Sequence, residues 1–282
     1  MQEPVARHYD SQGLRLNWWD WGNETAPPLL LVHGGLDHGR NWDWIARGLR
    51  DQYRVIAFDL RGHGESEWAK ASSYPVPDFV VDVVEFLRQM KIDRVKIIGH
   101  SMGGAISLLL AGIYPEYVER LIAIEGLRIF SPPATPMHVT MRNWIEQIHA
   151  NRAPRRMKSF EDALARFREA HPKRTEEQVL HLTKHGLRDN GDGTFSWKYD
   201  NGIRLRAPYR ISFEQSAAIW NRIECPTLLV GGGASGRPNP AENGWVQHFR
   251  HAEVRTFPDG GHWVQHDYPD EIIALARTFL KG

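Results

Sequence analysis

Ser101 lies at the centre of the segment GHSMG (residues 99–103), which matches the pattern G-x-S-x-G. An apolar run at 95–98 precedes it and a stretch of helical spacing follows it, so we expect a strand, a tight turn and a helix. Small residues at 99, 103 and 104 then prevent clashes between the strand and the incoming helix. The helix N-terminus faces the reacting oxygen, which is the arrangement of a serine nucleophile.

A histidine suited to general base chemistry lies near the C-terminus. His262 stands in the segment PDGGHW (258–263), after a predicted strand at 253–257 and before the last predicted helix. Catalytic groups of open α/β sheets gather outside the carboxyl ends of the strands. An imidazole at that edge can take a proton from a serine hydroxyl. We therefore expect His262 to act as the base for Ser101.

The segment HGGL (33–36) ends the first predicted core strand. A turn at this position can offer a backbone N–H to a developing oxyanion, and the amide of Met102 can supply a second donor. An ordinary glycine-rich turn is the other interpretation of the segment.

Apolar runs and amphipathic stretches alternate along most of the chain, which predicts an α/β fold with a mostly parallel, doubly wound sheet. We expect an N-terminal hairpin at about 7–20. The core strands are expected after it, at 29–33, 53–58, 94–99, 118–125, 227–231 and 253–257. The helices are expected at 41–49, 78–90, 102–114 and 270–280, with Asp78 as an N-cap.

The alternation stops between 127 and 219, where prolines punctuate a charged segment of helical character. We therefore predict a core of residues 1–126 and 220–282 and an inserted, mainly helical cap at 127–219, which we call the insertion. Within it, residues 160–171 have helical spacing, and the turn NGDG (190–193) precedes a short exposed strand.

Four segments in order resemble landmarks of the α/β-hydrolase superfamily: HGGLDHGRNW at 33–42, DLRGHGES at 59–66, GHSMGG at 99–104 and GGHW at 260–263. The resemblance covers nearly all of the chain outside the insertion. It implies the α/β-hydrolase fold with Ser101 as nucleophile, His262 as base, and the backbone N–H groups of Gly35 and Met102 as the oxyanion hole.

The third member of the triad departs from the usual pattern of that superfamily. The loop at 232–237 holds no carboxylate, and Ser235 stands near the position expected for an aspartate. A neutral hydroxyl cannot stabilise the imidazolium that forms on His262. Some members place the acid after the preceding strand, where Glu125 stands, although Glu125 could instead begin the insertion or pair with Arg128. The other candidate acids are Asp259, Asp267 and Glu242.

Composition excludes several classes of protein. Hydrophobic residues make up 41% of the chain and aromatic residues 11%, which is enough for a packed core and excludes disorder. The formal charge of +1 gives no field for nucleic acid. The longest apolar runs are far below the roughly 20 residues of a membrane span. Residues 1–13 lack an apolar signal segment, and the lone Cys225 cannot form an internal disulfide, so we expect the cytoplasm.

No cofactor or metal is expected. The pairs His181/His185 and His262/His266 have helical spacing but do not enclose the glutamate of a zinc protease motif. Residues 231–236 satisfy G-x-G-x-x-G, but Pro238 and Pro240 interrupt the helix that a dinucleotide site requires.

The predicted function is that of a serine hydrolase, a carboxylesterase that cleaves an ester, thioester or lactone of a small apolar acid through an acyl-enzyme on Ser101. We expect Leu36, Trp144, Trp197 and Trp263 to form apolar walls of the pocket. Two alternatives stay open: a hydrolase of carbon–carbon bonds with the same residues, and a non-catalytic ligand receptor. The expected partner is a small-molecule ester, and a homodimer stays open.

Overall fold

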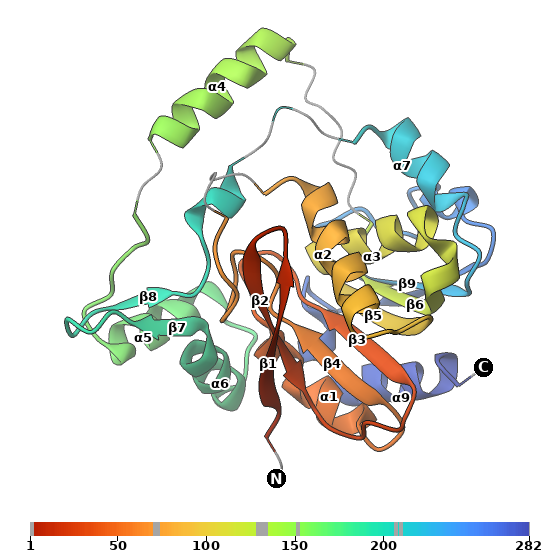
Figure 1. Ribbon diagram of the computed structural model, residues 1–282, viewed down its shortest axis with the longest axis horizontal. Coiled ribbons are helices and arrows are strands. Elements are labelled where there is room, and N and C mark those ends of the chain that lie inside the picture. Colours follow the sequence, from red (N-terminus) through yellow and green to blue (C-terminus); the bar gives the residue numbers. More distant parts are fainter. Residues whose placement is uncertain are drawn as a thin grey trace.

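An eight-stranded sheet runs through the centre of the structure, a computed structural model that describes residues 3–69, 74–127, 135–150, 153–205, 208 and 211–281 (Figure 1). In order across the sheet, the strands are β1 (Val5–Ser11), β2 (Leu14–Asp20), β4 (Arg54–Phe58), β3 (Pro28–Val32), β5 (Val95–His100), β6 (Val118–Ile124), β9 (Thr227–Gly232) and β10 (Ala252–Phe257). The strands from β4 to β10 pair in parallel, and the hairpin β1–β2 adds two antiparallel strands. The predicted hairpin and all six predicted core strands are confirmed.

Helices cover both faces of the sheet (Figure 1). Strand β3 shows why: Leu30 and Val32 belong to the apolar cluster on one face, and Leu29 and Leu31 belong to the cluster on the other. Successive side chains of a strand point to opposite faces, and each fully buried Leu or Val contributes about 1.5–3 kcal/mol. The first cluster includes residues of α2 (Val76–Gln89), α3 (Met102–Ile113) and α7 (Phe213–Trp220), and the second those of α1 (Asp43–Leu49) and α9 (Pro269–Phe279). The doubly wound α/β-hydrolase fold is confirmed.

Two helix starts differ from the predictions. The first predicted helix is divided into η1 (Gly39–Trp42) and α1. Helix α2 starts at Val76 with Pro75 as its N-cap, so the prediction that Asp78 caps it is wrong. Pro77 is accepted in the first turn, where backbone N–H groups have no helical partner, and the helix therefore begins before it. Asp78 lies in that turn and forms an ion pair with Arg61, with 3.0 Å between its Oδ2 and the Nη1 of the arginine.

The chain between β6 and β9 leaves the sheet. It forms α4 (Met137–His149), α5 (Phe160–Ala170), α6 (Glu176–Gly186), the hairpin of β7 (Leu187–Asp189) and β8 (Phe195–Trp197), η3 (Asn201–Arg204) and α7. Gly191 and Gly193 have φ of +76° and +80°, which confirms the predicted turn. A small apolar cluster around Met157, Ala163 and Leu187 holds this part together. The division at 127 and 219 stays a prediction, and α7 contacts the core helix α3.

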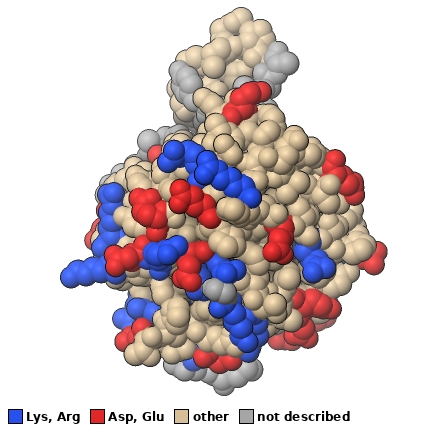
Figure 2. Space-filling view, turned by 90° about the vertical axis from the view of Figure 1, so that its right-hand side faces the viewer, with Lys and Arg blue, Asp and Glu red and all other residues tan. Residues whose placement is uncertain are grey.

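Helix α4 stands apart from the rest of the molecule, at the top of both overall views (Figure 1 and Figure 2). None of its residues is buried, and Met137 and Ile145 are 49% and 42% exposed. The face drawn in Figure 2 carries acidic and basic side chains side by side, as expected from a formal charge of +1.

The helices in the described ranges are short, and α2 has 14 residues. A membrane-spanning helix needs about 20 predominantly apolar residues. Within the described part of the chain, no helix combines the length and the apolar character needed to cross a bilayer.

The remaining short elements lie in connections. They are η2 (Pro115–Tyr117), η4 (Trp245–His248) and α8 (Val264–Asp267), which follows the loop of His262. Because parallel strands end at the same edge, the loops after β3, β5, β6, β9 and β10 meet there.

Candidate active site

Ser101 occupies a strained turn between β5 and α3. Its φ is +51° and its ψ is −114°, a conformation that L-residues rarely adopt. A Cβ atom on Gly99 would lie 2.6 Å from the carbonyl oxygen of Gly103, and one on Gly103 would lie 2.2 Å from the carbonyl oxygen of Val32. A Cβ on Gly104 would lie 2.7 Å from a backbone atom. The expected need for small residues at 99, 103 and 104 is confirmed.

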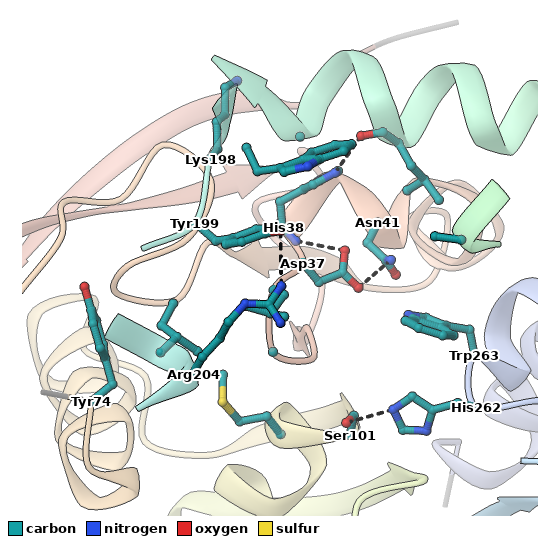
Figure 3. Close-up of a pocket in the computed structure, with 18 of the residues that line it drawn as sticks. Asp37, His38, Asn41, Tyr74, Ser101, Lys198, Tyr199, Arg204, His262 and Trp263 are labelled. Carbon is teal, nitrogen blue, oxygen red and sulfur yellow. Dashed lines mark hydrogen bonds between the residues drawn. The ribbon is translucent and has the colours of Figure 1, made fainter. Parts of the chain in front are cut away.

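His262 lies between Ser101 and Glu125. Its Nε2 is 3.0 Å from the Oγ of Ser101, and its Nδ1 is 3.2 Å from the Oε2 of Glu125. A carboxylate can only accept, so Nδ1 donates to Glu125 and Nε2 is left to accept the serine proton. The structure therefore brings together the three residues that the sequence singled out as nucleophile, base and acid. Figure 3 shows Ser101 and His262 of this group.

A second histidine holds the His262 loop in place. His100 donates from Nε2 to the carbonyl oxygen of His262 at 2.8 Å. Burial keeps the pKa of His100 well below its usual range, so its ring is neutral at pH 7. The two rings lie 4.8 Å apart, and the neutral state of His100 avoids repulsion with a protonated His262.

Glu125 is fixed at the end of β6 by its backbone and its side chain. Its φ is +52°, its amide donates to the carbonyl of Val230 at 2.8 Å, and its side chain is only 3% exposed. The Oε1 atom accepts from the amide of Gly232 at 2.7 Å. The Oε2 atom thus remains directed at His262, with the Arg237 guanidinium 3.9 Å away.

The alternative acids have other contacts. Asp267 accepts from the amide of Gly261 at 2.7 Å and pairs with Arg174 at 3.0 Å. Glu242 accepts from the side chain of Asn239, and Asp259 is exposed. Arg128, the alternative partner of Glu125, is outside the described residues. Glu125 is therefore the candidate acid that the structure places on His262.

The turn after β3 passes over the nucleophile. A Cβ on Gly34 would lie 3.2 Å from the Cβ of Ser101, and both Gly35 and Met102 line the same cavity as Ser101. The amide of Leu36, whose φ is +64°, donates to the Nε2 of His63 at 3.0 Å. That contact fixes the turn in which the backbone N–H of Gly35 is the predicted donor to the oxyanion.

Buried histidines hold this turn. Burial lowers the pKa of His63 to about 4 and that of His33 well below its usual range, so both rings are neutral acceptors at pH 7. The Nε2 of His33 accepts from the amide of Leu60. Nearby, Asp59 accepts from the amide of Gly39 at 2.6 Å. Through these bonds, residues of the segment 59–66 stabilise the turns around the site.

A cavity of about 1350 Å³ opens above Ser101 and His262 (Figure 3). It is lined by Leu36, Trp197 and Trp263, as predicted, but not by Trp144. Trp144 belongs to α4, which has no buried residue and stands apart. An amphipathic pattern identifies a helix but not its partner, and the prediction that Trp144 forms a wall is wrong in this structure.

The cavity is larger and more charged than the expected pocket for a small apolar acid. Typical ligand pockets measure about 300–1000 Å³. The basic residues of the lining are Arg155, Arg166, Arg174, Lys198, Arg204 and Arg237. The acidic residues of the lining are Asp37 and Glu169.

Asp37 has an unusual carboxyl group. Its Oδ1 accepts from the amide of His38 at 2.9 Å, and its Oδ2 accepts from the side chain of Asn41 at 2.6 Å (Figure 3). Burial nevertheless raises the pKa of Asp37 to about 7. Its charge therefore changes near neutral pH, inside the cavity.

Sequence reasoning missed several lining residues. Asp37, His38 and Asn41 lie inside the landmark at 33–42 and could have been found from it. Arg174 and Arg204 lie in the insertion without any motif around them. Within the described ranges, no three His, Cys, Asp or Glu side chains are grouped so that they could hold a metal ion.

Known proteins resemble this chain over most of its length. The family model described as alpha/beta hydrolase fold matches residues 27–269. A protein of Cupriavidus necator named 3-hydroxybutyrate-oligomer hydrolase is 32% identical, with 95% of this chain and 93% of the relative covered. Esterase Rv0045c of Mycobacterium tuberculosis is 27% identical, with 92% and 84% covered. The solved thioesterase domain from the curacin biosynthetic pathway has a TM-score of 0.89 at 23% identity, with 98% of this chain and 100% of that chain covered.

The family model spans the strands and loops that carry Ser101, Glu125 and His262. The chain belongs to the α/β-hydrolase fold family and is a hydrolase.

Proposed function

We propose that this hydrolase is a serine carboxylesterase that cleaves carboxylic esters through an acyl-enzyme on Ser101. The observation that carries the proposal is the chain of contacts from Glu125 through His262 to Ser101, at 3.2 and 3.0 Å. Thioesters and lactones are open to the same attack.

Acylation begins at the serine hydroxyl. The Oγ of Ser101 attacks the ester carbonyl carbon while its proton passes to the Nε2 of His262. The carbonyl oxygen becomes an oxyanion, which the amides of Gly35 and Met102 stabilise. The bond to the alcohol then breaks, and His262 returns the proton to the leaving oxygen.

Deacylation uses the same groups with water. His262 takes a proton from a water molecule, whose oxygen attacks the acyl carbon, and the acid is released when the proton returns to Ser101. In both steps the buried carboxylate of Glu125 stabilises the imidazolium. The receptor alternative depended on the missing carboxylate after β9. The contact of Glu125 with His262 removes that support.

Two relatives favour an ester as the bond that is cleaved. They are named as a 3-hydroxybutyrate-oligomer hydrolase and an esterase. The charged lining of the cavity argues against a substrate that is apolar throughout.

The test is covalent labelling by a fluorophosphonate together with turnover of 4-nitrophenyl butyrate. We expect rapid labelling mapped to Ser101, no labelling of Ser101→Ala and strongly slowed labelling of Glu125→Gln. Glu242→Gln is the matched control, because that carboxylate contacts Asn239 and not His262, and it should label as the wild type does.

Different results reject different parts of the proposal. Wild-type protein that is neither labelled nor active on the ester would reject the esterase. Fast labelling of Glu125→Gln would reject Glu125 as the acid. Labelling without ester turnover, together with hydrolysis of a vinylogous diketone, would replace the esterase by a carbon–carbon bond hydrolase.

A further inference from the structure

The walls of the cavity carry an excess of positive charge. Six basic side chains line it, against the two carboxyl groups of Asp37 and Glu169. A cleft lined by one sign of charge attracts ligands of the opposite sign. The overall charge of the chain is only +1, so this excess is local to the cavity.

Several of these cations form ion pairs with carboxylates, which neutralise their charge. Arg166 pairs with Asp162 at 2.8 Å on the same helix. Arg174 pairs with Asp267 at 3.0 Å, and Lys198 pairs with Glu65. The Arg237 side chain is 41% exposed and lies 3.9 Å from the Oε2 of Glu125.

Arg204 is different. It ends η3, and its guanidinium lies 5.6 Å from the ring centre of Tyr199 and donates to the Tyr199 hydroxyl at 3.4 Å. The hydrogen bond that the structure gives the Arg204 guanidinium is the one to this hydroxyl, and Arg204 forms none of the ion pairs within 4 Å among the residues with described positions. Figure 3 shows the Arg204 side chain extending into the cavity, between Tyr199 on one side and Ser101 and His262 on the other.

From this placement we infer that Arg204 binds a carboxylate of the substrate, so that the preferred substrate is an ester that also carries a carboxylate group. The inference rests on the proposed function, because the ester bond must lie over Ser101 while the carboxylate reaches Arg204. A guanidinium donates two parallel hydrogen bonds to a carboxylate. The aromatic ring of Tyr199 supports the guanidinium from one side without neutralising it.

The other groups of the cavity are compatible with an anion. Arg166, Arg174 and Lys198 are paired with carboxylates, and burial raises the pKa of Asp37, one of the two acidic groups of the lining, to about 7. Arg155, another exposed cation of the lining, adds positive charge to the wall of the cavity.

The test compares two esters of equal length, mono(4-nitrophenyl) adipate and methyl 4-nitrophenyl adipate. They differ only in whether the far end is a carboxylate or its methyl ester. We expect wild-type protein to prefer the acid in kcat/KM, and Arg204→Gln to lower kcat/KM for the acid about tenfold through KM. The neutral ester should change by less than about twofold, since it makes no charged contact, and Arg204→Lys should restore part of the preference.

Arg188→Gln is the matched control. Arg188 also lies over an aromatic ring, that of Trp68 at 5.0 Å, but it does not line the cavity. This variant should treat both esters as the wild type does. Raising the salt concentration should reduce the preference of the wild type and leave Arg204→Gln unchanged.

A binding measurement separates this inference from the proposed function. Calorimetry with adipate and dimethyl adipate on Ser101→Ala protein should show binding of adipate that Arg204→Gln weakens. If Arg204→Gln has the same ratio of kcat/KM for the acid and the neutral ester as the wild type, the carboxylate site is rejected and the esterase still stands. Absence of labelling and turnover, with binding of adipate that depends on Arg204, would reject the esterase and support the carboxylate site.

Discussion

The edge of the sheet and the insertion hold their side chains in different ways. Ser101 and Glu125 lie directly after central strands, in positive-φ turns enclosed by backbone atoms. Arg204 and Trp197 come from a segment with a small apolar cluster of its own. The difference teaches that the groups proposed to react are placed by the backbone of the core, whereas the proposed substrate contacts depend on side chains that can change without disturbing the core.

The largest effect is expected for the carboxylate at the sheet edge. Glu125→Gln should lower kcat for 4-nitrophenyl butyrate about 10⁴-fold, because a neutral amide cannot stabilise the imidazolium or enforce the tautomer of His262. The same change in the insertion, Glu169→Gln, should alter kcat less than about threefold, since Glu169 is exposed. Steady-state kinetics at pH 7.5 measures both. Similar losses in the two variants would remove the distinction between the regions.

Glycine substitutions sharpen the comparison through stability. Gly103→Ala places a Cβ 2.2 Å from the carbonyl oxygen of Val32, so we expect the free energy of unfolding to fall by about 3 kcal/mol and labelling of Ser101 to slow. Gly191 in the insertion has φ of +76°, and an added Cβ would meet no described atom within 4 Å. Gly191→Ala should therefore lower the free energy of unfolding by only about 1 kcal/mol. Urea unfolding followed by fluorescence gives both values. A Gly103→Ala protein as stable as the wild type would show that the turn can adjust.

Substitutions of two tryptophans compare two positions within the insertion. Trp197 lines the cavity, and its ring lies parallel to that of Tyr199 at 6.4 Å. Trp197→Ala should raise KM for 4-nitrophenyl butyrate about fivefold because apolar contact area is lost. Trp144→Ala should change KM less than about twofold, since α4 does not line the cavity. A larger effect of Trp144→Ala would mean that α4 reaches the substrate during turnover.

The sheet edge was predictable because its constraints are local. The alternation of apolar runs and amphipathic stretches predicted the strands. The glycines around Ser101 predicted a tight turn, and the structure leaves no room there for a Cβ atom. The strands and the turn need only backbone rules. Glu125 could be proposed because some members of the superfamily place the acid after the strand predicted at 118–125, and that strand, which the structure ends at Ile124, pairs with the strand before Ser101.

The insertion was less predictable because its contacts are distant in sequence. Nothing around Arg204 indicates that its side chain enters the cavity, since its position depends on the hairpin that ends at Trp197. The placement of Trp144 failed for the same reason. The N-cap at Asp78 was a local error, because proline tolerates the first helical turn as well as the position before it.

The smallest expected effect concerns Asp37, a core residue inside the cavity that the insertion covers. Because its pKa is raised to about 7, Asp37 is mostly protonated at pH 6 and mostly ionised at pH 8. Its charge then opposes a substrate carboxylate held in the same cavity, while His38, whose pKa burial lowers to about 3, stays neutral. Arg174 stays charged throughout this range. The preference for mono(4-nitrophenyl) adipate over its methyl ester should therefore fall about twofold to threefold from pH 6 to pH 8.

Taking the ratio of kcat/KM for the two esters cancels pH effects that are common to both substrates. In Asp37→Asn, this ratio should stay constant with pH. Asp93 is an exposed carboxylate outside the cavity, and in Asp93→Asn the ratio should change with pH as it does in the wild type.

The raised pKa of Asp37 also predicts an effect on stability of defined sign. Between the ordinary value of 3.8 and about 7, the folded protein binds the proton more tightly than the unfolded chain, so stability falls as the pH rises through this window. Asp37→Asn should remove that slope in thermal unfolding, and a slope unchanged by Asp37→Asn would assign it to another group.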